Sequence, residues 1–386
     1  MKKQLTRIAS WMLLATMGQA GAFAQNIRID MNQTYPEKTI SLQKVADVKY
    51  ISLETTDEML FNGIVTNLSA EGIAGFNKKE GDILVFDGTG KAIASFNHTG
   101  QGPNEYNKIY HLDVDWKQKE VYVQDNFRQK IRIYGLDGRH LRTIDLQEIM
   151  QEGDLYSFSD THLIYYAKPK SKPVTPYEPV TLLSKKDASK VTLPFIKTDD
   201  NLVKATGGPF GNMKMSAKNV NLLCKKGDEV YVNEVTADVI YRVESNHALT
   251  PVVERTPSYQ DASGQDFFLM LTGANARYYF FKRQQALLEF QGNAATDTKS
   301  TYVAYDRKEK QLLNPTFTNE DYPSQDIPMS KLLQCAGSAN RCYLQLEAFK
   351  LKEALAEGKL KGTLKSIAEK LDEEDNPVLM VVEFKK

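Results

Sequence analysis

Short apolar runs separated by polar turn residues recur along most of the chain. The runs at 83–86 and 121–123 consist of β-branched, aromatic and other apolar residues, and Gly, Asp and Asn stand near their ends. Runs of this length between turn signals predict β-strands, because a helix needs a longer segment with apolar residues every three or four positions. The chain is therefore predicted to be mostly β.

The strand pattern repeats at a fixed spacing. Residues 72–96 superimpose on residues 120–144 without a gap, an offset of 48. Gly90 falls on Gly138, which follows Asp137 between two apolar runs. An Asp-Gly pair in that place is a strong signal for a hairpin turn. The repeated unit is therefore a set of short antiparallel strands.

Five such units can be traced along the chain, near 64–100, 109–147, 155–195, 220–255 and 270–318. The remaining segment ends in a strong strand at 378–384, and the strand at 48–53 has no unit of its own. Repeated units of about four strands are typical of β-propellers. We predict an all-β, six-bladed β-propeller in which the N-terminal strand closes the last blade. A β-sandwich with long decorations is the alternative, and the fixed offset argues against it.

One region near the C-terminus has helical rather than strand periodicity. Between 347 and 371, apolar residues recur at helical spacing, as in Leu351 and Leu355, and Gly358 and Gly362 divide the stretch. This predicts two short helices inserted in the last blade. We expect their apolar stripes to pack on the propeller, and a partner-binding face is the alternative.

The N-terminus has the pattern of a secretory signal peptide at 1–24. Three basic residues precede a short apolar stretch at 8–17, and Ala22 and Ala24 form an A-x-A cleavage signature. The apolar stretch is well short of the roughly 20 residues that a membrane span needs. We therefore expect a single propeller domain at 25–386, exported to the periplasm or the exterior, without a membrane span.

The charge balance excludes one class of partner. The chain has 49 basic and 49 acidic residues, and removal of Lys2, Lys3 and Arg7 leaves 46 against 49. Such a chain lacks the excess of basic residues that nucleic-acid binding requires. We expect a monomer that binds no nucleic acid.

The three cysteines give one candidate disulfide. Cys335 and Cys342 flank a short loop and could pair in an oxidising compartment, although pairing depends on a Cα separation that sequence does not give. Cys224 lies in an apolar run and is interpreted as a buried thiol.

Three segments carry a resemblance to a known family. They are the loop TGQGPNEY at 99–106, the early segment ISLETT at 51–56 and the late segment NPVL at 376–379. The chain resembles the six-bladed β-propeller proteins of unknown function that Bacteroides-type bacteria export, with NHL-like repeats. Many members of that family are lipoproteins, but this chain has no cysteine near the cleavage signature. The resemblance implies no established reaction and no catalytic residues.

The loop with two glycines could be mistaken for a phosphate site. Gly100-x-Gly102 has neither the third glycine of a dinucleotide motif nor the Lys-Ser/Thr of a P-loop. We interpret the loop as a structural linker between blades. In this interpretation the glycines supply backbone angles that other residues avoid, and Pro103 fixes the bend. Glu105 accepts loop hydrogen bonds, and Tyr106 inserts its ring between blades.

No sequence motif for catalysis is present. The chain has no Cys-x₂-Cys or His-x₃-His pair and no Gly-x-Ser-x-Gly elbow. The histidines are scattered and are interpreted as surface or loop residues: His98, His111, His140, His162 and His247. No cofactor is predicted from these patterns.

Calcium is the one metal that the pattern leaves open. Asp113, Asp115 and Asp125 are spaced like acids at strand edges, and propellers can hold a cation in the central channel. Asp125 also aligns with Asn77 and Asn233 in the repeat. A polar residue that recurs at this strand end either caps a turn or faces the channel mouth.

These observations favour an exported binding or scaffolding module that recognises a glycan, a peptide or an envelope protein. The Pro-rich segment 167–180 is a candidate binding loop, with a plain solvated loop as the alternative. The alternative function is a metal-dependent enzyme of the lyase or lactonase type, with a site at the channel mouth.

Overall fold

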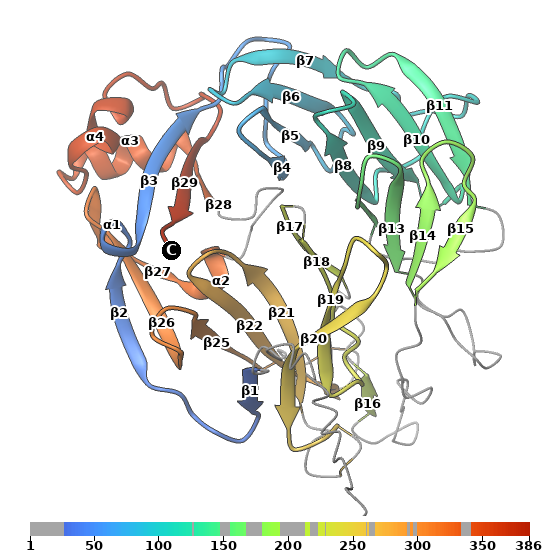
Figure 1. Cartoon of the computed structure of the whole chain (residues 1–386). Coiled ribbons are helices and arrows are strands. Elements are labelled where there is room, and N and C mark those ends of the chain that lie inside the picture. Colours follow the sequence, from blue (N-terminus) through green and yellow to red (C-terminus); the bar gives the residue numbers. More distant parts are fainter. Residues whose placement is uncertain are drawn as a thin grey trace, which may run out of the picture.

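The chain folds into a ring of six β-sheets around a central axis (Figure 1). The structure is a computed structural model, and it describes residues 27–125, 127–146, 155–166, 180–193, 213–216, 223–227, 229–259, 261, 267–291, 294–295, 299–332 and 341–386. The predicted all-β, six-bladed propeller is confirmed, and the β-sandwich alternative is wrong.

The first three blades are regular four-stranded antiparallel sheets. Blade 1 contains β4 (Ile64–Leu68), β5 (Gly72–Phe76), β6 (Ile83–Asp87) and β7 (Ala92–Phe96). Blade 2 contains β8 (His111–Asp115), β9 (Glu120–Asp125), β10 (Lys130–Gly135) and β11 (His140–Asp145). Blade 3 contains β12 (Leu155–Ser157), β13 (His162–Tyr166), β14 (Val180–Ser184) and β15 (Lys190–Thr192).

The last three blades carry additions. Blade 4 contains β17 (Leu223–Lys226), β18 (Glu229–Val232), β19 (Val239–Val243) and β20 (Leu249–Thr256). Blade 5 contains β21 (Phe267–Ala274), β22 (Tyr278–Gln285), β25 (Ser300–Asp306) and β26 (Gln311–Asn319), and β27 (Tyr322–Pro328) pairs with the end of β26. Blade 6 contains β28 (Arg341–Leu346), β29 (Val378–Phe384) and β3 (Ala46–Ser52).

The N-terminal segment supplies an outer strand to each of these three blades in turn. β1 (Ile27–Asp30) pairs in parallel with β20, and β2 (Glu37–Ser41) pairs in parallel with β26. After the short helix α1 (Leu42–Val45), β3 pairs antiparallel with β29, which confirms the predicted closing strand. The sequence did not predict β1 and β2, because each is short and fully buries a single isoleucine.

The predicted helical insertion lies between β28 and β29. It consists of α3 (Ala348–Ala356) and α4 (Gly362–Ala368), while the one-turn α2 (Met329–Leu332) precedes β28. The apolar side of the insertion is buried in the core of blades 5 and 6, which confirms the predicted packing on the propeller: Leu351, Ala354, Leu364 and Ala368. The same core contains Phe280, Phe317 and Phe384, whose ring centroids lie 5.9–6.2 Å apart.

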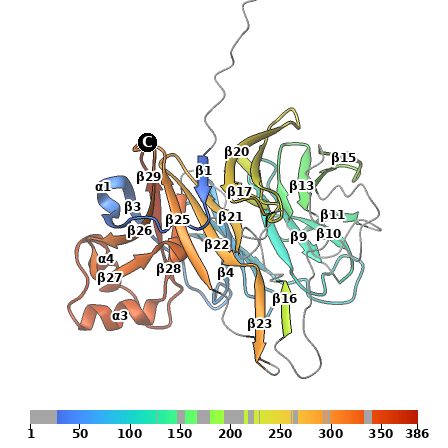
Figure 2. The same cartoon turned by 90° about the horizontal axis from the view of Figure 1, so that it is seen from below.

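A second addition projects from the same face of the ring as the helices. It is formed by β23 (Leu287–Gln291) and β24 (Ala294–Ala295), which extend the hairpin of blade 5, and by β16 (Met213–Ser216), which pairs with β23. Figure 2 shows α3, β16 and β23 on one side of the ring. We call this side the helix face.

Three predictions concern residues outside those that the structure describes. They are the signal peptide at 1–24, most of the Pro-rich segment, 167–179, and Cys335 of the candidate disulfide. Its expected partner, Cys342, is buried in β28. In the described part of the chain, no helix is long and apolar enough to cross a membrane.

Candidate ligand-binding site

The predicted linker loop at 97–110 joins blade 1 to blade 2. Tyr106 is fully buried, and its hydroxyl donates a 2.8 Å hydrogen bond to the carbonyl of Gly81 in blade 1. Its ring lies edge-on to Tyr134 of blade 2, with 6.1 Å between centroids. The Tyr106 side chain therefore contacts both blades.

The explanation of the two glycines from backbone angles is wrong. Neither Gly100 nor Gly102 has a φ in the left-handed region. Instead, a Cβ on Gly100 would lie 2.0 Å from Oε2 of Glu105, and one on Gly102 would lie 3.1 Å from it. That oxygen accepts a 2.6 Å hydrogen bond from the Gly102 amide. The glycines therefore make room for the Glu105 carboxylate, while Pro103 is exposed.

The carbonyls of this loop also accept hydrogen bonds from a side chain of the protein. The guanidinium of Arg128 donates to the carbonyl of Gly102 at 2.9 Å and to that of Gly100 at 3.0 Å. Glu105 already accepts from the Gly102 amide, and Arg128 binds the carbonyls of Gly100 and Gly102. The loop therefore does not present the row of amides that a phosphate cradle needs.

The acids considered for calcium are bound by basic side chains, Asp125 by Arg132 at 3.3 Å and the other two by lysines. Asp113 accepts hydrogen bonds from Lys225 at 3.1 Å and from the Ser157 amide at 2.7 Å. Burial raises the pKa of Asp113, but the Lys225 charge and the Ser157 amide outweigh it, so the pKa lies below its ordinary value. Asp115 pairs with Lys185 at 2.5 Å. These carboxylates join blade 2 to blades 3 and 4 rather than forming a ring of cation ligands.

The polar residue that recurs at the end of the second strand of a blade forms hydrogen bonds to backbone groups. The Asn77 side-chain oxygen accepts from the Asn62 amide at 3.0 Å, in the segment that leads into β4. The Asp125 carboxylate likewise accepts from the Asn107 amide at 2.8 Å, in the segment that leads into β8. Asn233 instead bonds both backbone groups of Leu271 in blade 5. This supports the turn-capping interpretation over the channel mouth.

Histidine rings contact neighbouring blades, and those of His111 in blade 2 and Tyr156 in blade 3 lie 4.8 Å apart. The rings of His162 and His247, in blades 3 and 4, lie 6.1 Å apart. Among the described residues, no three His, Cys, Asp or Glu side chains are placed to hold a metal ion.

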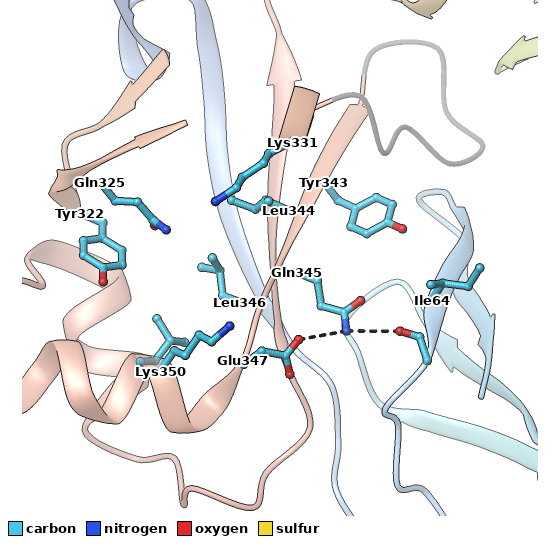
Figure 3. A pocket seen from close by; sticks show the side chains of 12 residues that line it. Ile64, Tyr322, Gln325, Lys331, Tyr343, Leu344, Gln345, Leu346, Glu347 and Lys350 are labelled. Atoms are coloured by element: carbon cyan, nitrogen blue, oxygen red, sulfur yellow. Dashed lines mark hydrogen bonds between the residues drawn. The ribbon is translucent and has the colours of Figure 1, made fainter. Parts of the chain in front are cut away.

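A pocket between blade 6 and blade 1 is the strongest candidate site (Figure 3). Its volume is about 430 Å³, within the range of small-ligand sites. The lining comes from the start of β4, from β27 and α2, and from β28 and α3: Gly63, Ile64, Tyr322, Gln325, Lys331, Tyr343, Leu344, Gln345, Leu346, Glu347, Lys350 and Leu351.

The strand β28 forms the rigid back of the pocket. The Tyr343 hydroxyl donates to the carbonyl of Val65 at 2.5 Å, and the Gln345 amide reaches the carbonyl of Gly63 at 3.4 Å. Leu344 and Leu346 are at least nine-tenths buried. The site therefore rests on packed strands rather than on a loose loop.

The polar groups at the front of the pocket are two lysines. Lys331 on α2 and Lys350 on α3 are exposed, and neither forms an ion pair with any residue in the described ranges. The Lys350 ammonium lies over the Phe349 ring, 5.4 Å from its centroid. Glu347 is an acid in the lining, and Gln345 donates to it at 3.4 Å.

Sequence reasoning missed this pocket. Its residues come from segments up to about 290 positions apart, and none of them forms a motif. The available signal was indirect, since the helical insertion breaks the propeller repeat at Glu347 and Lys350.

One protein family matches this chain over almost its whole described length. Residues 26–383 match the family described as a domain of unknown function, DUF4934. The chain belongs to the DUF4934 family. This agrees with the resemblance to exported propellers of unknown function, and no curated protein matches this DUF4934 chain.

Solved structures support the fold of the DUF4934 chain. A Bacteroides fragilis protein that carries the description of an exported protein matches with a TM-score of 0.60 and 15% identity, over 93% of this chain and 99% of its own. A member of the DUF4221 family from Bacteroides vulgatus matches with a TM-score of 0.50 and 8% identity, over 89% and 99%. At these identities the likeness concerns the fold alone.

Proposed function

We propose that this DUF4934 protein is an exported binding module and that its ligand enters the pocket between blades 6 and 1. The observation that carries the proposal is two lysines, Lys331 and Lys350, that have no ion-pair partner among the described residues and lie at the front of a pocket with a rigid back. A few polar groups placed on a concave wall fix the orientation of a ligand. The ligand class is a glycan, a peptide or an envelope protein.

Exposed apolar side chains around the pocket support the same site. Ile64 in the lining is 37% exposed, and Phe349 beside Lys350 is 45% exposed. Large apolar groups that remain exposed close together are typical of interaction surfaces. The helix face therefore offers both a pocket and an apolar rim.

The enzyme alternative has less support. A lyase or lactonase of the kind considered requires several metal ligands at the channel mouth. In the ranges that the structure describes, Asp113 and Asp115 are paired with lysines and no cluster of three metal-binding groups occurs. We therefore favour binding over metal-dependent catalysis.

Glycan and peptide arrays with a pocket-filling variant test the proposal. Ile64→Trp places an indole in the pocket, and Ile93→Trp, on the outer strand β7, is a matched control because Ile93 is 48% exposed. We expect a ligand of the native protein to bind Ile64→Trp at least about tenfold more weakly and Ile93→Trp unchanged. Silent arrays without a co-purifying envelope partner, or equal binding to Ile64→Trp, would overturn the proposal.

A further inference from the structure

We propose that the pocket takes an oligosaccharide that carries a carboxylate, as in a uronic acid. This rests on the proposed function, because it names the ligand class of the same site. The inference comes from three properties of the lining: its charge, its hydrogen-bonding groups and their arrangement around the pocket.

The charge of the lining favours an anion. Lys331 and Lys350 come from α2 and α3, and Figure 3 shows both ammonium groups directed into the pocket. Glu347 is the only acid among the described lining residues, so their formal charge is +1. The Glu347 carboxylate faces Gln345, which donates to it. Two ammonium groups that form no ion pair within the described part of the chain therefore remain for a carboxylate on the ligand.

The neutral polar groups favour hydroxyls. Gln345 uses its amide hydrogens on Gly63 and Glu347 and offers its oxygen, whereas Gln325 and the Tyr322 hydroxyl each carry both a donor and an acceptor. A sugar hydroxyl also donates and accepts, so Gln325 and Tyr322 match it in either direction. The apolar side chains of Ile64 and Leu344 can contact the C–H faces of a pyranose ring, which bear no hydroxyl hydrogens.

The arrangement of these groups argues against an extended peptide. Peptides in extended form usually bind along a strand edge or groove, in a line of alternating donors and acceptors. Here the polar side chains stand around a cup, on β27, α2, β28 and α3 (Figure 3). A compact ligand with acceptors on several sides fits a cup better than a chain does.

Titration of the full chain with trigalacturonate by calorimetry tests the inference. The comparison ligands are its fully methyl-esterified form, which keeps the hydroxyls and loses the charge, and a triglutamate peptide, which keeps the charge and loses the hydroxyls. We expect trigalacturonate to bind at least about tenfold more tightly than either comparison ligand, and more weakly as salt rises.

Two variants locate the charge. Lys331→Met and Lys350→Met retain an apolar stem of similar length, and each is expected to weaken trigalacturonate binding about threefold to tenfold. Lys370→Met is the matched control, because Lys370 is exposed, follows α4 and does not line the pocket. It should leave the affinity unchanged, and the melting temperatures of the three variants show that all remain folded.

The outcomes separate this inference from the proposed function. Equal binding of the acid and the ester, tighter binding of triglutamate, or no effect of either lysine variant would overturn the acidic sugar. No binding of trigalacturonate would overturn it too. A neutral ligand found on the arrays and lost in Ile64→Trp would still leave the pocket as the binding site.

Discussion

Glu234 is a carboxyl group held in the interior between blades 3 and 4. It is 3% exposed, Tyr166 donates a hydrogen bond to one oxygen, and the Thr236 hydroxyl donates to the other at 3.0 Å. Burial raises the pKa of Glu234, and the hydrogen bonds from Tyr166 and Thr236 offset only part of this effect. The folded protein therefore retains this proton at a pH where the unfolded chain loses it.

This residue makes stability depend on pH in a definite direction. Its contribution is fully present below the pKa of the unfolded chain, near 4.5, and is lost as pH rises through the raised folded pKa. Glu234→Gln removes the ionisation and keeps the shape. We expect the free energy of unfolding of the variant, relative to the native protein, to rise with pH above about 4.5. Urea unfolding between about pH 4 and pH 8 measures it, and a difference independent of pH would contradict the prediction.

The sequence predicted the roles of single residues where the repeat allowed equivalent positions to be aligned. Asn77 and Asp125 could be aligned, and both proved to fasten the segment that enters their own blade. The role of Gly100 could not be predicted in the same way. It depends on where the folded loop places the Glu105 carboxylate, and the sequence does not show this.

At the scale of elements, the turn between the last two strands of a blade is a repeated joint. Gly90 and Gly138, which align at the offset of 48, both have positive φ, +92° and +79°. Each glycine lies against the outer strand of the neighbouring blade, β3 of blade 6 or β7 of blade 1. A Cβ on Gly90 would lie 2.3 Å from the Ser52 carbonyl, and one on Gly138 would lie 2.6 Å from the Phe96 ring. The glycine thus allows both the turn and the close approach of two blades.

Gly90→Ala should therefore lower the free energy of unfolding more than a glycine substitution that introduces only backbone strain. Gly358, after α3, has a φ of +68° and no atom within 4 Å of an added Cβ. We expect Gly358→Ala to lower the free energy of unfolding by about 1 kcal/mol, from left-handed strain. Gly90→Ala should lower it by about 2–4 kcal/mol, since overpacking adds to the strain. Chemical denaturation of both variants measures the difference, and equal losses would show that the blade contact is unimportant.

Strands and helices were predicted where the pattern was strong. The strands of blades 1 and 2 and the two inserted helices follow from periodicity, because each buries a regular set of apolar positions. The pocket could not be predicted, since its walls come from β4, β27 and β28, which only the closed ring brings together.

At the scale of the whole molecule, ring closure depends on the first described residues of the chain. β1, β2 and β3 complete blades 4, 5 and 6. The segment between β1 and β2 is also anchored, because Arg283 donates to the carbonyl of Gln33 at 2.7 Å and Tyr35 is buried. Three adjacent contacts to the N-terminal segment, rather than one, therefore hold the ring shut.

Removal of residues 27–41 should destabilise the whole ring. A chain that starts at Leu42 keeps α1 and β3 but leaves the outer strands of blades 4 and 5 as open edges. We expect a melting temperature lower by about 10 °C or more, with self-association, relative to a chain that starts at Gln25. Calorimetry and size-exclusion chromatography measure both effects. A monomeric truncated protein with an unchanged melting temperature would show that β1 and β2 only decorate the ring.

The positions of the two ends of the described chain determine how the molecule presents its pocket. Figure 2 shows β1 and the C-terminal end of β29 on the side of the ring away from α3, β16 and β23. A tether at either end would therefore hold the protein with its helix face turned away from the surface that carries it. A sensor chip loaded through a terminal tag would leave the pocket open to solution, and a cell envelope that held the protein by its N-terminus would direct the pocket outward.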